Sequence, residues 1–206
     1  MTDIPTYFLK FIFDIKAFVI QDTKLKSGVS SPYYVNLHKL ISYPDFLDKI
    51  IHFCIENLNL ETKKNNYNHI AGVPYGGIVF ASLISNKLNV SMIMPRKEQK
   101  QYGLKKSIEG DYNDNDKIIL VEDTITSGSS ILNTIQLCEQ NNLNIELIII
   151  IMDREEGGVD LLKSKGYNVS VLFKCSDIIE YLNTNNLIDS NDYTKICQYN
   201  KNLLTK

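Results

Sequence analysis

The chain has 206 residues, of which 44% are hydrophobic, and its 22 lysines and arginines against 24 aspartates and glutamates leave a formal net charge of −2. This length suffices for one sizeable core, and we interpret residues 1–206 as a single domain. The composition argues against recruitment by nucleic acid or by an acidic membrane surface, so any phosphate site has to be local.

The cysteines and the N-terminus bear on the cellular compartment. The four cysteines lie far apart and form no CxxC pair, which argues against a zinc site and against a secreted disulfide framework. The apolar runs near the N-terminus are interrupted by Asp3, Lys10, Asp14 and Lys16, so neither a signal peptide nor a membrane span fits. We therefore expect a cytoplasmic protein with reduced thiols in its core.

The first regular elements follow from hydrophobic spacing. Apolar residues recur at helical intervals from Asp45 to Leu58, which predicts a helix that buries one face. The short run His69–Val73 predicts a buried strand that enters a glycine turn, and a helix is expected to follow through Leu88.

The second half of the chain alternates between strand and helix patterns. Four further apolar runs are expected to form strands, at 90–94, 117–121, 144–152 and 167–173. The continuous Leu/Ile run of 144–152 is typical of a parallel strand buried on both faces. Helices are expected at 129–141 and 158–165, which makes the connections parallel crossovers. This alternation predicts a three-layer α/β fold with a central, mostly parallel sheet.

The segment from Met94 to Asn115 differs from its surroundings because it holds few apolar positions. A structureless stretch of this length in a compact domain is usually functional or disordered. Between residues 95 and 106 the sequence has one acidic residue, Glu98, and five basic residues: Arg96, Lys97, Lys100, Lys105 and Lys106. Such a loop suits a diphosphate, although a solvated surface face would have the same composition.

The strongest functional signal is an apolar strand followed by two acids and a loop of small residues. This segment reads Glu122-Asp123-Thr124-Ile125-Thr126-Ser127-Gly128-Ser129-Ser130. Gly128 and the hydroxyl residues allow backbone N–H groups to converge on a phosphate at a helix N-terminus, where the helix dipole favours negative charge. Glu122 and Asp123 lie at the carboxyl end of a strand, where open α/β sheets bind ligands, and can accept hydrogen bonds from a ribose diol. A capped turn with solvated acids is the alternative.

This segment resembles the signature of type I phosphoribosyltransferases, which bind 5-phosphoribosyl 1-diphosphate (PRPP). A nucleotide-binding P-loop does not fit, because no GxxxxGK(S/T) pattern occurs. The resemblance implies an N-terminal hood, mainly residues 1–40, and a mobile lid at about 96–112. It assigns PRPP contacts to all nine residues of the segment and to Lys26, Tyr75, Gly76, Arg96, Lys97 and Lys100.

Three further motifs are similar to orotate phosphoribosyltransferases, and the match to the first half of bifunctional UMP synthases is especially close. The first is residues 25–36, which resemble the hood segment whose lysine reaches PRPP. The resemblance implies that Lys26 contacts PRPP and orotate, and that Tyr34 and Val35 line the base pocket. A turn followed by an edge strand is the alternative reading.

The second motif is residues 96–103, continuing to Gly110. In the resembled family this loop closes over the active site of the neighbouring subunit. The resemblance therefore implies a homodimer in which Lys100 and Tyr102 act across the interface. Together with Asp123, these two residues are the expected catalytic residues.

The third motif is Met152-Asp153-Arg154-Glu155 at the end of the 144–152 strand. A planar guanidinium suits the carboxylate of orotate, and Arg154 matches the orotate-binding arginine of the family. By the same resemblance, Thr126 contacts the orotate ring. A salt bridge at the strand end is the alternative.

The chain departs from the family pattern at two positions. Gly76 lies where some bacterial relatives have a lysine, so that side-chain contact is absent, while backbone contacts from Tyr75 and Gly76 stay open. Bacterial members often have histidine in place of Tyr102, so a histidine acid–base role is not transferred. The histidines of the chain match no catalytic position and are expected to be structural or exposed; they are His38, His52 and His69.

The resemblance implies transfer of the phosphoribosyl group of PRPP to orotate, giving orotidine 5′-monophosphate and pyrophosphate in pyrimidine biosynthesis. Mg²⁺ is the expected cofactor, held mainly by PRPP and water, with no fixed protein ligands. The expected partners are orotate, PRPP and a second copy of the chain, with no nucleic acid and no membrane. Three alternatives stay open: a purine or uracil phosphoribosyltransferase, a PRPP-sensing regulator that binds nucleic acid, and a fragment of a bifunctional UMP synthase.

Overall fold

The computed structural model describes residues 4–24, 30–97 and 107–203. Three of the expected site residues, Lys26, Lys100 and Tyr102, lie outside these ranges.

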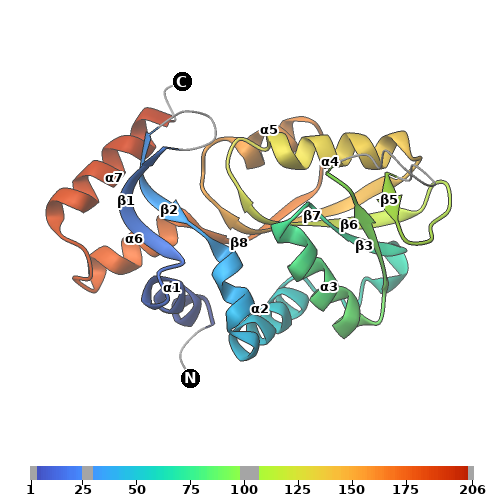
Figure 1. Cartoon of the computed structure of the whole chain (residues 1–206), viewed down its shortest axis with the longest axis horizontal. Helices are drawn as coiled ribbons and strands as arrows, with labels where there is room; N and C mark the ends of the chain where they lie inside the picture. The colour runs from blue at the N-terminus through green and yellow to red at the C-terminus, as the bar shows by residue number, and fades with distance from the viewer. Residues whose placement is uncertain (1–3, 25–29, 98–106, 204–206) are drawn as a thin grey trace.

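A six-stranded sheet forms the centre of the molecule, with strand order β5-β4-β3-β6-β7-β8 (Figure 1). The strands are β3 (His69–Gly72), β4 (Ser91–Pro95), β5 (Ile108–Glu109), β6 (Lys117–Ile125), β7 (Asn144–Asp153) and β8 (Val169–Lys174). Every neighbouring pair is parallel except β4 and β5. The predicted α/β fold with a mostly parallel central sheet is therefore confirmed.

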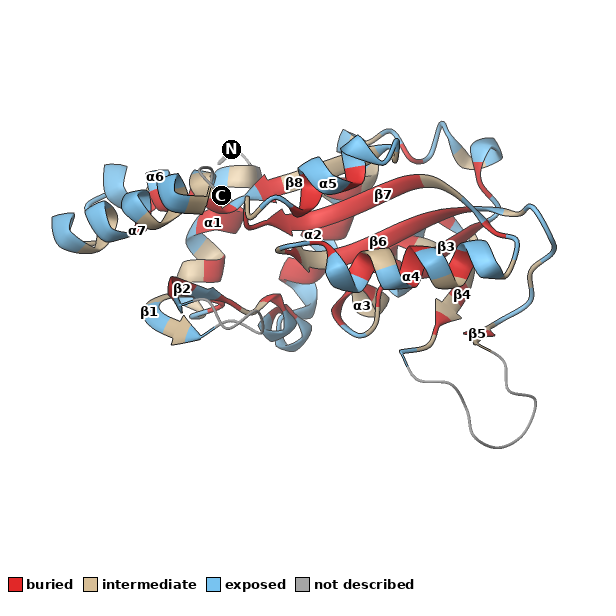
Figure 2. Ribbon diagram, turned by 90° about the horizontal axis from the view of Figure 1, so that it is seen from above, coloured by how far each residue is buried: buried red, intermediate tan, exposed pale blue. Residues whose placement is uncertain are grey.

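The middle of the sheet is buried on both faces, as its Leu/Ile-rich sequence predicts. Residues 148–152 of β7 are all 0% exposed, and the central strands are coloured as buried in Figure 2. Ile149 and Ile151 pack into one core cluster and Ile148 and Ile150 into a second. Successive side chains of a strand point to opposite faces, so the two clusters lie on opposite sides of the sheet.

Helices cover both faces of the sheet (Figure 1). The helices α2 (Pro44–Asn57) and α3 (Gly76–Leu88) contribute to the first core cluster, and α4 (Ser129–Gln140) and α5 (Gly158–Ser164) to the second. These four helices match the ones expected from hydrophobic spacing. Within the described ranges no helix is both long and apolar enough to cross a membrane.

The two ends of the chain form a layer beside the main sheet (Figure 1). It contains α1 (Ile4–Asp14), the antiparallel pair β1 (Phe18–Lys24) and β2 (Ser30–Val35), the 3₁₀ turn η1 (Leu37–Ser42), α6 (Cys175–Thr184) and α7 (Ser190–Leu203). A second 3₁₀ turn, η2 (Lys64–Asn66), lies in the polar loop before β3. The helix α1 contacts α6, and α7 contacts β2. The hood thus draws on the C-terminus as well as on the expected residues 1–40.

The sheet differs from the sequence prediction mainly in the length of β6 and in the presence of β5. β6 continues through Glu122, Asp123 and Thr124 to Ile125, because these residues stay in parallel register with β7. The expected loop from Met94 to Asn115 contains β5, which pairs with β4 through Met94↔Glu109 and Pro95↔Ile108. Ile108 is 0% exposed, so burial of this one side chain anchors the returning end of the segment.

The cysteines give a direct test of the packing. Cys54, Cys138 and Cys175 are buried and Cys197 is exposed. Burial raises the pKa of the Cys54 and Cys138 thiols to about 12 and raises that of Cys175 as well. Since the thiolate is the reactive form, we expect a disulfide reagent at about pH 8 to label one thiol per folded chain and all four in denaturant.

A Cys197→Ser variant should leave the folded protein unlabelled, since it removes the exposed thiol. Rapid labelling of a second thiol without denaturant would show that the core is looser than described.

Candidate active site

A cavity of about 540 Å³ lies at the carboxyl ends of β3 and β6. Its walls come from the end of β6, the turn into α3, residues 96–97 after β4, and one face of α4. In parallel sheets the carboxyl ends of the strands form the ligand-binding edge. The predicted acids, the glycine turn and the basic pair are thereby brought together around one space.

The end of β6 supplies the acidic wall of this cavity. Glu122, Asp123 and Thr124 all line it. Glu122 is buried at 6% exposure, and the side chain of Asp123 is 14% exposed. Nε2 of His38 lies 3.3 Å from Oδ2 of Asp123. His38 also lines the cavity, so its imidazole lies next to the Asp123 carboxylate on the hood side.

Two glycines at the start of α3 lie against the end of β6, Gly76 against a side chain and Gly77 against the backbone. A Cβ atom on Gly76 would lie 2.3 Å from Cγ of Asp123, and one on Gly77 would lie 2.2 Å from the carbonyl oxygen of Val121. These separations are far below ordinary contact distances, so any side chain at position 76 would have to displace the Asp123 carboxylate. The missing side chain thus explains how the acid and the turn share one wall.

The loop 126–130 leads into α4 and has the geometry of an anion site. Gly128 adopts the left-handed conformation at φ 81° and precedes α4, whose N-terminus has no side-chain cap among the described residues. Uncapped N–H groups and the helix dipole favour an anion at this position. The N–H of Gly158 donates to the carbonyl oxygen of Thr126 at 2.9 Å. A Cβ on Gly158 would lie 2.3 Å from that oxygen, so glycine at 158 allows α5 to support the loop.

One face of α4 extends the cavity beyond the predicted loop. Ser130, Asn133, Thr134 and Leu137 all line it, and their spacing places them on one side of a helix. The Thr134 hydroxyl donates to the Ser130 carbonyl oxygen within the helix, at 3.2 Å. The longest polar side chain on this face is that of Asn133. Of these four residues the sequence motif identifies Ser130 alone, because the other three lie inside the helix beyond the loop.

Arg96 and Lys97 give the cavity its basic side. Nη1 of Arg96 lies 2.7 Å from Oε1 of Glu109, and its backbone N–H donates to the carbonyl oxygen of Ser107 at 3.0 Å. Nζ of Lys97 lies 5.6 Å from the centre of the Tyr75 ring, a cation–π distance. The base of the predicted lid is therefore fixed by β5 and by the turn before α3.

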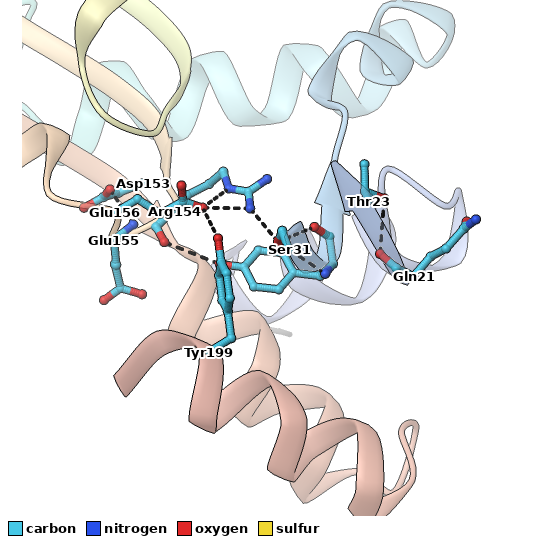
Figure 3. Close-up of polar contacts among 9 residues, drawn as sticks. Gln21, Thr23, Ser31, Asp153, Arg154, Glu155, Glu156 and Tyr199 are labelled. Carbon is cyan, nitrogen blue, oxygen red and sulfur yellow. Dashed lines mark hydrogen bonds and ion pairs between the residues drawn. The ribbon is translucent and has the colours of Figure 1, made fainter. Parts of the chain in front are cut away.

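Arg154 lies at the end of β7 and joins three parts of the molecule (Figure 3). Its Nη2 atom lies 2.7 Å from Oε1 of Glu156 and 2.9 Å from the Ser31 hydroxyl. The guanidinium packs 4.7 Å from the Tyr33 ring centre, and Glu156 also accepts a hydrogen bond from the Tyr199 hydroxyl at 3.4 Å. Burial at 3% exposure opposes the charge of Arg154, but Glu156 raises its pKa above the ordinary value.

The residues expected to bind orotate do not line the cavity. Tyr34, Val35, Thr126 and Arg154 are all described, and none is part of its lining. Tyr34 is 44% exposed and Val35 is 8% exposed, because neighbours on a strand point to opposite faces. Of the described residues expected to contact PRPP, eight line the cavity: Tyr75, Gly76, Arg96, Lys97, Glu122, Asp123, Thr124 and Ser130. The other five, residues 125–129, do not line it. The buried arginine cluster at the hood is likewise separate from the cavity lining. The roles of these residues stay predictions.

His38 is exposed, as predicted, since 55% of its side chain is accessible. It also lies beside Asp123 at the edge of the cavity, which the sequence does not predict. The two residues are far apart in the chain, and no local pattern links η1 to the end of β6. No local pattern identifies Gly158 either, although its N–H supports the loop through the carbonyl oxygen of Thr126.

Comparison with known proteins identifies the family. The profile of the phosphoribosyl transferase domain matches residues 42–180. The orotate phosphoribosyltransferase of Sulfolobus acidocaldarius is 35% identical over 192 residues, which cover 93% of this chain and 95% of that protein. The uridine 5′-monophosphate synthase of Bos taurus is 29% identical over 91% of this chain, which spans 39% of the bovine protein.

Solved structures agree with the sequence comparison. The UMP synthase of Leishmania donovani superposes with a TM-score of 0.81 at 26% identity, over 96% of this chain and 42% of that one. Family profile, sequence relatives and fold point the same way, and the chain belongs to the phosphoribosyl transferase domain family and, within it, to the orotate phosphoribosyltransferases.

Proposed function

We propose that this chain transfers the phosphoribosyl group of PRPP to orotate, which gives orotidine 5′-monophosphate and pyrophosphate on the route to UMP. One observation carries the proposal: a single cavity is faced by two acids from β6, by residues 96–97 and by the start of α4. These groups match the diol, the diphosphate and the 5′-phosphate of PRPP. The names of the sequence relatives support orotate as the acceptor.

Charge complementarity favours one orientation of PRPP across the cavity and the adjoining N-terminus of α4. The 5′-phosphate would lie at residues 126–130, where N–H groups and the helix dipole favour it. The ribose hydroxyls would then face Glu122 and Asp123, and the diphosphate would extend toward Tyr75, Gly76 and the basic pair 96–97. Backbone groups at the glycine turn can approach the diphosphate closely because no side chain intervenes.

Mg²⁺ dependence belongs to the proposal. Within residues 4–24, 30–97 and 107–203 no group of three or more His, Cys, Asp or Glu side chains could hold a metal ion. Mg²⁺ keeps several waters and often binds through substrate phosphates and one or two carboxylates. Glu122 and Asp123 fit this role as partners of a hydrated ion carried by PRPP. When bound, the ion would neutralise charge on the diphosphate.

The reaction needs positioning and charge stabilisation. A ring nitrogen of orotate attacks the anomeric carbon, the bond from that carbon to the diphosphate breaks, and the ribose passes through an oxocarbenium-like state. No covalent bond to the protein is required. Arg96 and Lys97 would stabilise charge on the departing pyrophosphate, and exclusion of water would protect PRPP from hydrolysis.

Orotate is proposed to bind through its carboxylate to Arg154. In the structure Nε and Nη2 are engaged by Glu156 and Ser31, while Nη1 takes part in neither contact. Orotate would therefore bind Nη1 or compete with the Glu156 carboxylate for the guanidinium. Both routes place the base at the junction of β7 and the hood.

The active form is proposed to be a homodimer in which Lys100 and Tyr102 serve the neighbouring site. This part rests on the similarity of residues 96–110 to the family lid, because both residues lie outside the described ranges. It is testable independently of the orotate assignment.

The first test is loss of orotate absorbance with PRPP and Mg²⁺, beside uracil, hypoxanthine and adenine. We expect turnover with orotate alone, and EDTA should abolish it because the ion neutralises the diphosphate. An Asp123→Ala variant serves as the inactive control. Turnover of another base, with orotate left unused, would refute the proposed acceptor, and full activity in EDTA would refute the metal requirement.

The second test isolates Arg154. Removing it alone would leave Glu156 buried without its partner, which costs about 3–5 kcal/mol in comparable pairs. We therefore compare the double variant Arg154→Met/Glu156→Gln with the single variant Glu156→Gln, which keeps Arg154. The arginine loss should raise KM for orotate about tenfold or more, and KM for PRPP by less than about twofold. An equal rise in both constants would remove Arg154 from the orotate site.

The third test concerns the lid. Lys100→Ala should lower turnover roughly ten- to a hundredfold, because it removes a charge-assisted bond to the leaving group. Mixing Lys100→Ala with Asp123→Ala chains should then restore about a quarter of the wild-type activity, since half of the dimers are hybrids with one complete site. Differently tagged chains would verify subunit exchange. No recovery after exchange would mean that each lid serves its own subunit.

A further inference from the structure

His38 faces the acidic end of β6 from a well-anchored segment. It lies in η1, where Leu37 and Leu40 are each 1% exposed and fix the turn in the core. The Lys39 ammonium donates to the carbonyl oxygen of Ile15 at 3.2 Å, which ties the same turn to the hood. The backbone that carries the imidazole is thus fixed beside the cavity by the packing of its neighbours.

The Asp123 carboxylate has two close neighbours, the Gly76 backbone and this imidazole. Both of its oxygens lie within 2.5 Å of where a Cβ of Gly76 would stand. Its Oδ2 atom lies 3.3 Å from Nε2 of His38. Gly76 leaves room for the carboxylate because it has no side chain. Packing against Gly76 therefore does not by itself fix the orientation of the two carboxylate oxygens.

We propose that His38 is a positioning residue for Asp123. In this role the contact of Nε2 with Oδ2, 3.3 Å apart, would restrict the carboxylate so that Oδ1 accepts a hydrogen bond from a ribose hydroxyl of the phosphoribosyl donor. The proposal rests on the proposed function, in which Asp123 faces the ribose. A carboxylate ordered before the substrate arrives loses less conformational freedom on binding, which increases affinity.

A second histidine provides an internal comparison. Nε2 of His52 lies 3.1 Å from Oε1 of Glu56, one turn away on α2, and both side chains are more than 60% exposed. Such surface pairs contribute little. The His38–Asp123 pair differs because its carboxylate is 14% exposed, faces a cavity and comes from a distant part of the chain.

The test compares His38→Ala, His38→Gln and, as the matched control, His52→Ala. PRPP binding with Mg²⁺ is measured by calorimetry without orotate, and KM and kcat are measured in the full reaction. His38→Ala should raise the Kd and KM for PRPP roughly three- to tenfold, the size of one hydrogen bond, while KM for orotate changes by less than about twofold. His38→Gln should restore most of the affinity, since its amide nitrogen can replace Nε2. His52→Ala should match the wild type.

A double-mutant cycle separates positioning from direct contact. In an Asp123→Asn background, His38→Ala should weaken PRPP binding by less than about twofold, because the group it orients has changed. An equal loss in both backgrounds would overturn the proposal in favour of a direct contact between His38 and PRPP. Unchanged Kd and KM for His38→Ala in the wild-type background would overturn it outright.

The outcome is distinguishable from failure of the proposed function. A wild type that binds PRPP without consuming orotate would refute the reaction, and the calorimetric comparison would still decide the role of His38. Absence of PRPP binding by the wild type would overturn both. Unfolding midpoints check that each variant is folded, and we expect them to agree within about 2 °C because His38 is half-exposed.

Discussion

The candidate site depends on the close approach of the α3 N-terminus to the end of β6. Gly77 allows this approach, since a Cβ there would lie 2.2 Å from the Val121 carbonyl oxygen, and Gly76 leaves room for the Asp123 carboxylate. A larger residue at position 77 would move the turn away from the strand end, because it would meet backbone, whereas one at position 76 would displace only the Asp123 side chain. The acids, Ser130 at the start of α4 and the basic pair after β4 face one cavity. They do so because this approach fixes the turn between β3 and α3 against β6.

A second constraint operates at the end of β7. Arg154 is 3% exposed, and a buried guanidinium needs partners that offset its desolvation. Those partners come from β2 through Ser31 and from the segment after β7 through Glu156, which Tyr199 of α7 contacts in turn (Figure 3). The cluster therefore links hood, sheet and C-terminal helix. Any change at Glu156 would alter contacts in all three.

Much of the fold was predictable because its signals are local. The Leu/Ile run of β7 and the helical stripe of α2 each identify an element from adjacent residues, and the segment from Glu122 to Ser130 contains its whole motif within nine positions. The misses have physical reasons. In α7 Ile196 is the buried residue, so no apolar stripe marks the helix. β6 was ended too early because its last residues are polar and are kept in the strand by pairing with β7.

The parts of the site that sequence could not supply depend on tertiary contacts. His38 meets Asp123 only after η1 packs against the core, and Gly158 supports the loop 126–130 through one hydrogen bond from a separate element.

The most direct measurement of the central claim is a crystal structure of the protein with PRPP and Mg²⁺. The account predicts the ribose hydroxyls within hydrogen-bond distance of Asp123 and the 5′-phosphate at the N-terminus of α4. PRPP bound away from these groups, with the cavity filled only by solvent, would contradict it.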